Sequence, residues 1–159
     1  MNVELAVRQS LWTSMHRSLD ERHPFAYERV GFLTTRTVAS GAGNLSIEAT
    51  AWAPVADSDY QADDRVGASI GPAAFRKILQ LVHFNPGGVL HVHRHDHQGT
   101  PAFSRTDARS MRDFIPSFFN ANAANPHGAL LLSLDGAVGV VRLSPNSKDI
   151  PLARVIIRP

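Results

Sequence analysis

Apolar residues recur along this chain at two different intervals, and each interval predicts one type of secondary structure. In residues 4–19 the apolar side chains of Leu5, Leu11, Met15 and Leu19 follow an imperfect helical spacing. This segment is therefore expected to form a helix that buries one side.

A second helix has the clearest pattern in the chain. Pro72 stands in its first turn, where proline is favoured, and apolar residues then follow at helical intervals. The residues "NPGG" (85–88) are expected to end it. A third helix is expected from Ser104, a typical N-cap residue, and Pro116 should stop or kink that helix.

The remaining apolar segments alternate with polar residues or are rich in β-branched and aromatic residues, which is typical of strands. The expected strands cover residues 26–38, 44–55, 89–95, 129–134, 138–143 and 153–159. The first two should pair across the turn "ASGAG", and the fourth and fifth should form a hairpin around "DGA". The order of the elements predicts one mixed α/β domain over residues 1–159.

Composition narrows the classes of protein to consider. The 159 residues, of which 43% are hydrophobic and 19% charged, are ordinary for a globular domain. No apolar run reaches the roughly 18 residues of a membrane span, and the N-terminus lacks the pattern of a secretory signal. The net charge is only +2 and the arginines are scattered, so neither a nucleic-acid partner nor a membrane is predicted.

The chain contains no cysteine. This absence excludes disulfides and thiolate zinc sites, so any metal must be bound by His, Asp or Glu. It also fits the reducing cytoplasm, which is the expected compartment.

One segment concentrates polar chemistry that the apolar pattern does not explain. Residues 90–107 contain four of the chain's eight histidines, and His91, His93 and His95 alternate within an expected strand. Side chains at i and i+2 share a face of a strand, so these imidazoles can converge on one ion. Asp107 lies one turn inside the third expected helix and points back toward the strand end. The segment therefore predicts a metal site with Asp107 as the third protein ligand.

The order of these residues resembles the JAMM motif of the JAB/MPN metalloproteases, in which His-x-His on a strand is followed by a short loop and Ser-x-x-Asp at a helix start. That family also has a glutamate on an early strand, and "ERVGFL" supplies Glu28 in a similar place. The resemblance covers roughly residues 5–140. It implies an α/β fold, a single JAB/MPN-type domain whose mixed β-sheet is flanked by helices with cytidine-deaminase-like layering.

The spacing leaves the choice of histidine pair open, because no pair matches the usual distance of the family from the second histidine to the serine. The residue before the first ligand should be apolar, since it faces the core, and Val92 therefore favours His93 and His95. His91 would then either contact a metal ligand without binding the metal or replace His95 as an alternative ligand. His97 belongs to the loop or to a substrate groove.

The resemblance implies a zinc-dependent peptidase with one Zn²⁺ per chain, bound by His93, His95 and Asp107. Glu28 would move the proton as general base and acid, and Ser104 would donate a hydrogen bond to the oxyanion of the tetrahedral intermediate. Catalytic members of the family cleave isopeptide or peptide bonds after the tail of ubiquitin or a ubiquitin-like protein. The chain is similar to small bacterial deconjugases whose operons also encode E1-like and E2-like enzymes, some of them acting in antiphage defence.

The implied partners are a ubiquitin-like modifier, its conjugates, and the E1-like and E2-like proteins of the same pathway. Two alternatives are a catalytically silent scaffold of the same fold that binds a partner protein, and a metal-sensing module that does not need Glu28. The acidic segment 57–64 is interpreted as a solvated loop, with a surface for a basic face of the modifier as the alternative.

Overall fold

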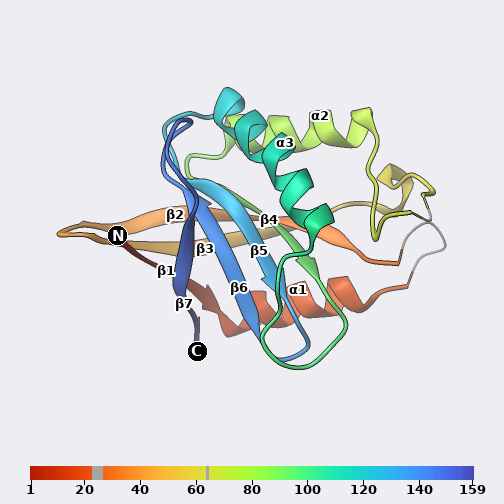
Figure 1. Ribbon diagram of the computed structural model, residues 1–159, viewed down its shortest axis with the longest axis horizontal. Coiled ribbons are helices and arrows are strands. Elements are labelled where there is room, and N and C mark those ends of the chain that lie inside the picture. The colour runs from red at the N-terminus through yellow and green to blue at the C-terminus, as the bar shows by residue number, and fades with distance from the viewer. Residues whose placement is uncertain (23–26, 64) are drawn as a thin grey trace.

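Seven strands form a sheet that closes on itself within residues 1–22, 27–63 and 65–159, which the computed structural model describes (Figure 1). The order of the strands around the barrel is β1-β3-β2-β4-β5-β6-β7, and β7 pairs with β1. Along the chain the elements are β1 (Asn2–Arg8), α1 (Gln9–Asp20), β2 (Val30–Gly41), β3 (Asn44–Pro54), a 3-10 turn η1 (Asp57–Asp59), α2 (Pro72–Phe84), β4 (Val89–Arg94), α3 (Arg105–Ala121), β5 (His127–Leu132), β6 (Ala137–Arg142) and β7 (Ile150–Arg158).

The closed barrel shows that the expected α/β fold of JAB/MPN type, with a mixed sheet flanked by helices and cytidine-deaminase-like layering, was wrong. Strand β1 is the element that closes the sheet, because it lies parallel to β3, with Leu5 opposite Ile47, and also parallel to β7. The helix that the apolar spacing predicts over residues 4–19 begins only at Gln9, so the prediction was wrong for residues 4–8. Val3, Leu5 and Val7 alternate and are all fully buried, so the strand period decides the structure of this segment.

Both expected hairpins are confirmed. Strand β2 pairs antiparallel with β3, and β5 pairs antiparallel with β6. At the β2–β3 turn Ala42 and Gly43 have positive φ angles of 47° and 81°, a conformation that suits glycine better than alanine. The last strand is longer than expected because β7 pairs with β1 along most of its length.

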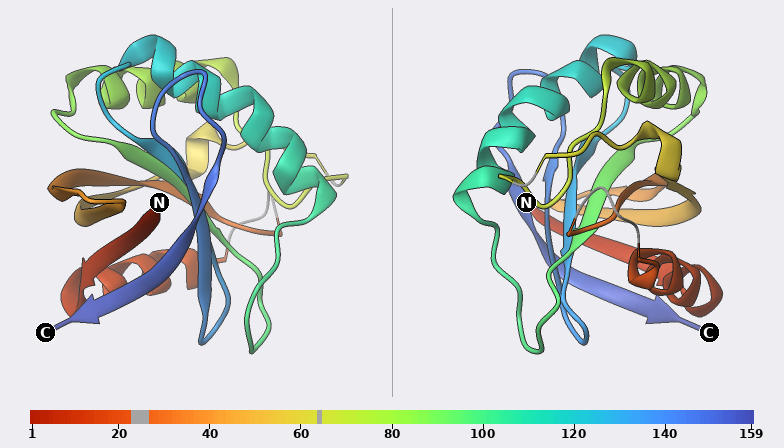
Figure 2. Two further views of the ribbon diagram at one scale, coloured as in Figure 1. Left: turned by 60° about the vertical axis from the view of Figure 1, so that its left-hand side comes forward. Right: turned by 90° about the vertical axis from the view of Figure 1, so that its right-hand side faces the viewer.

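The helices cover the barrel from two sides (Figures 1 and 2). Helices α2 and α3 lie together over one side, where Ile78, Val82 and Phe118 pack on apolar side chains of the sheet. Helix α1 lies on the opposite side, where Met15 and Leu19 join the main cluster of the barrel. No helix in the described part of the chain is long and apolar enough to cross a membrane.

Strand β4 runs between these two layers of side chains. Leu90 and Val92 belong to the cluster beside α1, whereas Val89 belongs to the cluster beneath α2 and α3. Since successive side chains of a strand point to opposite faces, the odd-numbered positions of β4 face α2 and α3. His91 and His93 are therefore directed toward the side of the barrel that these two helices cover.

Helix α3 continues for more than a turn beyond Pro116, so of the two expected effects, a stop or a kink, the stop does not occur. Proline has no N–H to donate to the carbonyl of Arg112, and a proline inside a helix costs about 3 kcal/mol or more. Pro116 is on the exposed side, where water can reach that carbonyl. Ile115, Phe118 and Phe119 are buried on the other side, and burial of each stabilises the helix by about 1.5–3 kcal/mol.

His127 links β5 to the end of α3 and is fully buried. Its Nδ1 accepts a hydrogen bond from the Val89 N–H at 3.1 Å, and its Nε2–H donates to the Asn122 carbonyl at 2.7 Å. These two bonds require a neutral ring protonated at Nε2. Burial lowers the pKa of His127 below its ordinary value of 6.5.

We expect the free energy of unfolding to decrease as the pH falls below about 6.5, since the unfolded chain binds a proton that buried His127 does not accept. His127→Phe should cost about 1–3 kcal/mol near neutral pH by leaving the Val89 N–H without a partner. When the pH is lowered from about 7.5 to about 5, the free energy of unfolding should decrease less in this variant than in the wild type. Chemical denaturation of both proteins with a chelator present measures this, and equal losses would exclude His127 as the responsible group.

Candidate metal centre

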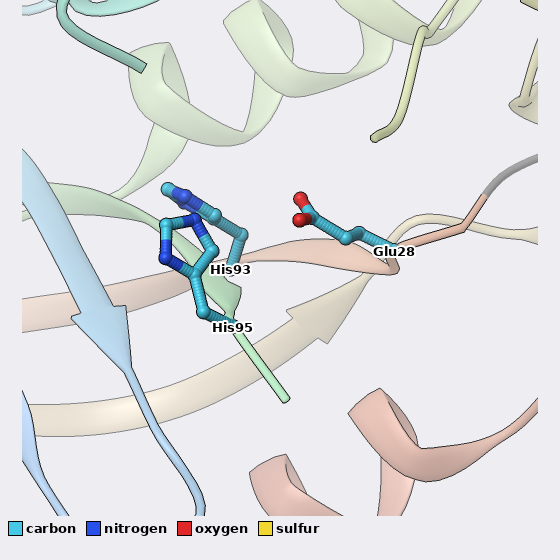
Figure 3. Close-up of side chains that lie close together, drawn as sticks. All are labelled: Glu28, His93 and His95. Atoms are coloured by element: carbon cyan, nitrogen blue, oxygen red, sulfur yellow. The ribbon is translucent and has the colours of Figure 1, made fainter. Parts of the chain in front are cut away.

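Three side chains converge on one point between β4 and the segment that precedes β2 (Figure 3). The ligand atoms of Glu28, His93 and His95 all lie within 4.8 Å of one another. His93 is buried, and the other two are half-buried. These three side chains meet this distance among the described residues, and a fourth, Asp107, contacts both histidines.

The barrel holds the two histidines in register. His93 lies on β4, opposite Val30 of β2 and beside Leu131 of β5. His95 follows one residue after the end of β4, and its N–H donates to the Leu132 carbonyl at 2.9 Å. The centroids of the two rings are 5.2 Å apart, so both imidazoles lie on the face that the alternation predicts.

Asp107 contacts both histidines from α3. Its Oδ1 is 3.0 Å from Nε2 of His93, and its Oδ2 is 3.4 Å from Nε2 of His95. A capping box orients the carboxylate, because Oδ2 accepts from the Ser104 N–H at 2.7 Å and the Asp107 N–H donates to Ser104 Oγ at 3.1 Å.

The environment of Asp107 favours the ionised carboxylate. Partial burial acts to raise the pKa of Asp107, but the neighbouring His93 ring and the bonds with Ser104 outweigh burial and hold this pKa well below its usual range. An ionised carboxylate is the form that binds a cation. The structure therefore places Asp107 in its ionised form beside His93 and His95, and its role as third ligand stays a prediction.

Glu28 reaches the histidines from outside the sheet. It lies before β2, which begins at Val30, and not on the strand where the resemblance placed it. Its N–H donates to the Gly67 carbonyl at 2.9 Å. Burial raises the pKa of the Glu28 carboxyl above its ordinary value, and the nearby His93 and His95 reduce this shift without cancelling it.

His93 shows that these residues fit a metal ion. Both of its ring nitrogens are buried and neither makes an aligned hydrogen bond in the described structure, although Asp107 Oδ1 is 3.0 Å from Nε2. A buried polar atom without a partner costs about 1–3 kcal/mol, and such atoms are rare. A cation shared with Asp107 would supply a partner for one of these two nitrogens. Two imidazoles and a carboxylate suit zinc and other divalent first-row metals.

The other two histidines of the cluster do not join the ligand group. The His91 ring lies 5.6 Å from that of His93 but also packs on Phe114, with ring centroids 4.5 Å apart. Burial lowers the pKa of His91 to about 3, so this ring is neutral. His97 is exposed, with its ring 6.2 Å from that of His95. The geometry therefore favours His93 and His95 over the other pairs.

A cavity of about 400 Å³ adjoins the candidate centre and shares Glu28, His93 and Asp107 with it. Most of the remaining lining is apolar and comes from the barrel, both covering helices and the loop before α2: Val30, Phe32, Ile70, Phe75, Met111 and Phe114. The sequence patterns did not predict this cavity. Two of its residues could have been placed beside Asp107 from the sequence, because Met111 and Phe114 follow Asp107 at i+4 and i+7 and so share its helix face.

The acidic segment 57–64 is engaged within the chain. Asp57 and Asp59 form ion pairs with Arg29 and Lys77. Tyr60 is buried, and its hydroxyl bonds to the backbone of β2, so it is not available to a partner protein. Asp64 lies outside the described residues.

We predict that Asp107 is a metal ligand and that Glu28 is not. Asp107→Asn should weaken zinc binding by more than the roughly 10- to 100-fold that the loss of a ligand's hydrogen-bond partner costs. Glu28→Gln should change the affinity less than about tenfold, since three protein ligands remain. Competition with a chromophoric chelator measures both affinities. A larger loss of zinc affinity in Glu28→Gln than in Asp107→Asn would show that Glu28, and not Asp107, is the ligand.

The chain matches no family model and no curated protein. The candidate metal centre is therefore supported by the geometry of its own residues.

Proposed function

We propose that this chain is a zinc-dependent isopeptidase or peptidase that cleaves after the C-terminal tail of a ubiquitin-like protein. One observation supports the proposal above all: a histidine of β4, the histidine that follows this strand and two acids from distant segments meet beside a largely apolar cavity. The similarity to the JAMM metalloproteases concerns these residues and their order, since the expected fold was wrong.

His93, His95 and Asp107 are the residues that would hold the metal. A bound zinc ion would polarise a carbonyl group and lower the pKa of a coordinated water toward ~7. The three side chains come from β4, the residue after it and the first turn of α3, so the barrel and the helix cap orient them before any ion binds. Such preorganisation reduces the cost of assembling a site.

Glu28 is the residue placed to move the proton. Its carboxylate faces the histidines (Figure 3) and lines the cavity in which a substrate would lie. It would take a proton from the attacking water and deliver it to the leaving amine. Partial burial raises the pKa of the Glu28 carboxyl, so this group is a stronger proton acceptor for the first transfer than a solvated glutamate would be.

Ser104 can serve the cap and the reaction together. Its Oγ accepts the Asp107 N–H with one lone pair, so its own O–H remains able to donate. The side chain is exposed at the N-terminus of α3, where the helix dipole favours negative charge. An oxyanion that forms during acyl transfer would therefore be stabilised there.

The substrates would be a ubiquitin-like modifier in its conjugates or in a linear precursor. The E1-like and E2-like proteins of a bacterial conjugation pathway, in some cases an antiphage pathway, are the further partners that we propose. The proposed compartment is the cytoplasm, in keeping with a chain that has no cysteine.

The first test is metal analysis of the purified chain together with cleavage of ubiquitin-like proteins fused to a C-terminal reporter. We expect one zinc per chain, loss of cleavage on chelation and recovery with zinc. Glu28→Gln should retain zinc and lower kcat at least about 100-fold, whereas His93→Ala should lose both zinc and activity. Glu21→Gln, an exposed acid before the same segment, is the matched control and should behave as the wild type.

Two results would contradict the proposal. Zinc binding without cleavage of any of several modifiers would indicate a metal sensor or a scaffold. A chain purified without chelators that contains no metal would show that the cluster of histidines and acids is not a metal centre.

A second prediction separates the two roles of Ser104. Ser104→Gly should cost only a few tenths of a kcal/mol, because glycine is nearly as good as serine at an N-cap. The lost O–H should nevertheless lower kcat about 100- to 1000-fold if it stabilises the oxyanion. Thermal unfolding and steady-state kinetics measure the two effects. An unchanged kcat in Ser104→Gly would show that this serine only caps the helix.

A further inference from the structure

The position of Glu28 depends on contacts outside the sheet, because Glu28 lies two residues before the start of β2. The carbonyl of Gly67 accepts hydrogen bonds from two successive amides, Tyr27 and Glu28, each at 2.9 Å. These hydrogen bonds therefore fix the backbone of Glu28 to the loop that precedes α2.

This loop is itself anchored to the barrel. The Tyr60 hydroxyl accepts from the Val30 N–H at 2.9 Å, and an isolated β-bridge joins Tyr60 to Ile70. The N–H of Gln61 donates to the Ser69 carbonyl at 2.7 Å. The contacts that locate Gly67 thus begin at β2, and they do not depend on the Glu28 side chain.

Gly67 leaves space for the Glu28 carboxylate. A Cβ atom on residue 67 would lie 2.4 Å from Oε2 and 2.5 Å from Cδ of Glu28, closer than such atoms approach in proteins. The described glycines with positive φ are Gly41, Gly43 and Gly99, so the backbone at Gly67 does not itself require glycine. Residue 67 must lack a side chain because the Glu28 carboxylate occupies the space where its Cβ atom would lie.

We propose that Gly67 is a positioning residue for Glu28: it fixes the Glu28 backbone through its carbonyl and admits the carboxylate to the place where it faces His93 and His95. This inference rests on the proposed function, in which Glu28 moves the proton. The three atoms nearest to a Cβ on residue 67 all belong to the end of the flexible Glu28 side chain. The fold therefore tolerates the added methyl group, and the carboxylate turns away from the histidines.

Four variants test this role in the full-length zinc-loaded chain. Gly67→Ala should keep the melting temperature, the zinc content and KM of the wild type and lower kcat about 100-fold, the cost of misplacing a reacting group by about 1 Å. Gly71→Ala adds the same methyl to the same loop, where it meets Gln61 at 2.9 Å, and should keep kcat. Gly67→Ala should have no further effect on kcat in a Glu28→Gln background, because the displaced base is already absent.

A crystal structure of Gly67→Ala supplies a measurement that does not depend on turnover. We expect the Glu28 carboxylate to have rotated away from His93 and His95, with the backbone of residues 27–28 still bonded to residue 67. A carboxylate in its original place, or an equal fall in kcat with and without Glu28, would overturn the inference. If the wild type cleaves no substrate, the proposed function fails, while the carboxylate position still decides whether Gly67 positions Glu28.

Discussion

Strand β4 is paired along both edges, antiparallel to β2 and parallel to β5, and the candidate centre depends on this pairing. Because side chains alternate, a slip of one residue would turn the histidines toward α1 and move Leu90 and Val92 out of the main cluster. Both apolar residues are fully buried in that cluster, and the burial of each contributes about 1.5–3 kcal/mol. The hydrophobic core on one face of β4 therefore secures the register of His93 on the other.

The two acids reach the histidines by different routes, and this difference separates their chemistry. Asp107 is held by the cap of α3, and its pKa is lowered by its neighbours despite partial burial. Glu28 is held by a loop, and burial raises its pKa. Two carboxyl groups whose environments move their pKa values in opposite directions are suited to different roles, one as an ionised ligand and the other as a proton carrier.

The parts of the site that the sequence predicted follow from rules that act over a few residues. Alternation places His93 and His95 on one face, and the three-residue spacing of Ser104 and Asp107 forms the capping box. The same rules failed at the N-terminus, where β1 runs directly into α1 at Gln9. No glycine or proline separates the two segments, so apolar residues of a strand and of a helix were combined into one helical pattern.

The sequence by itself determined which residue types are available to a metal, the shared face of the histidines and the cap that orients Asp107, because each depends on neighbours along the chain. Tertiary structure alone decided the closure of the sheet through β1, the approach of Glu28 to His93 and His95, and the space that Gly67 leaves for Glu28. Each of these results from contact between segments far apart in the chain. No periodicity or cap signals such contacts, since they form only when the closed barrel brings the segments together.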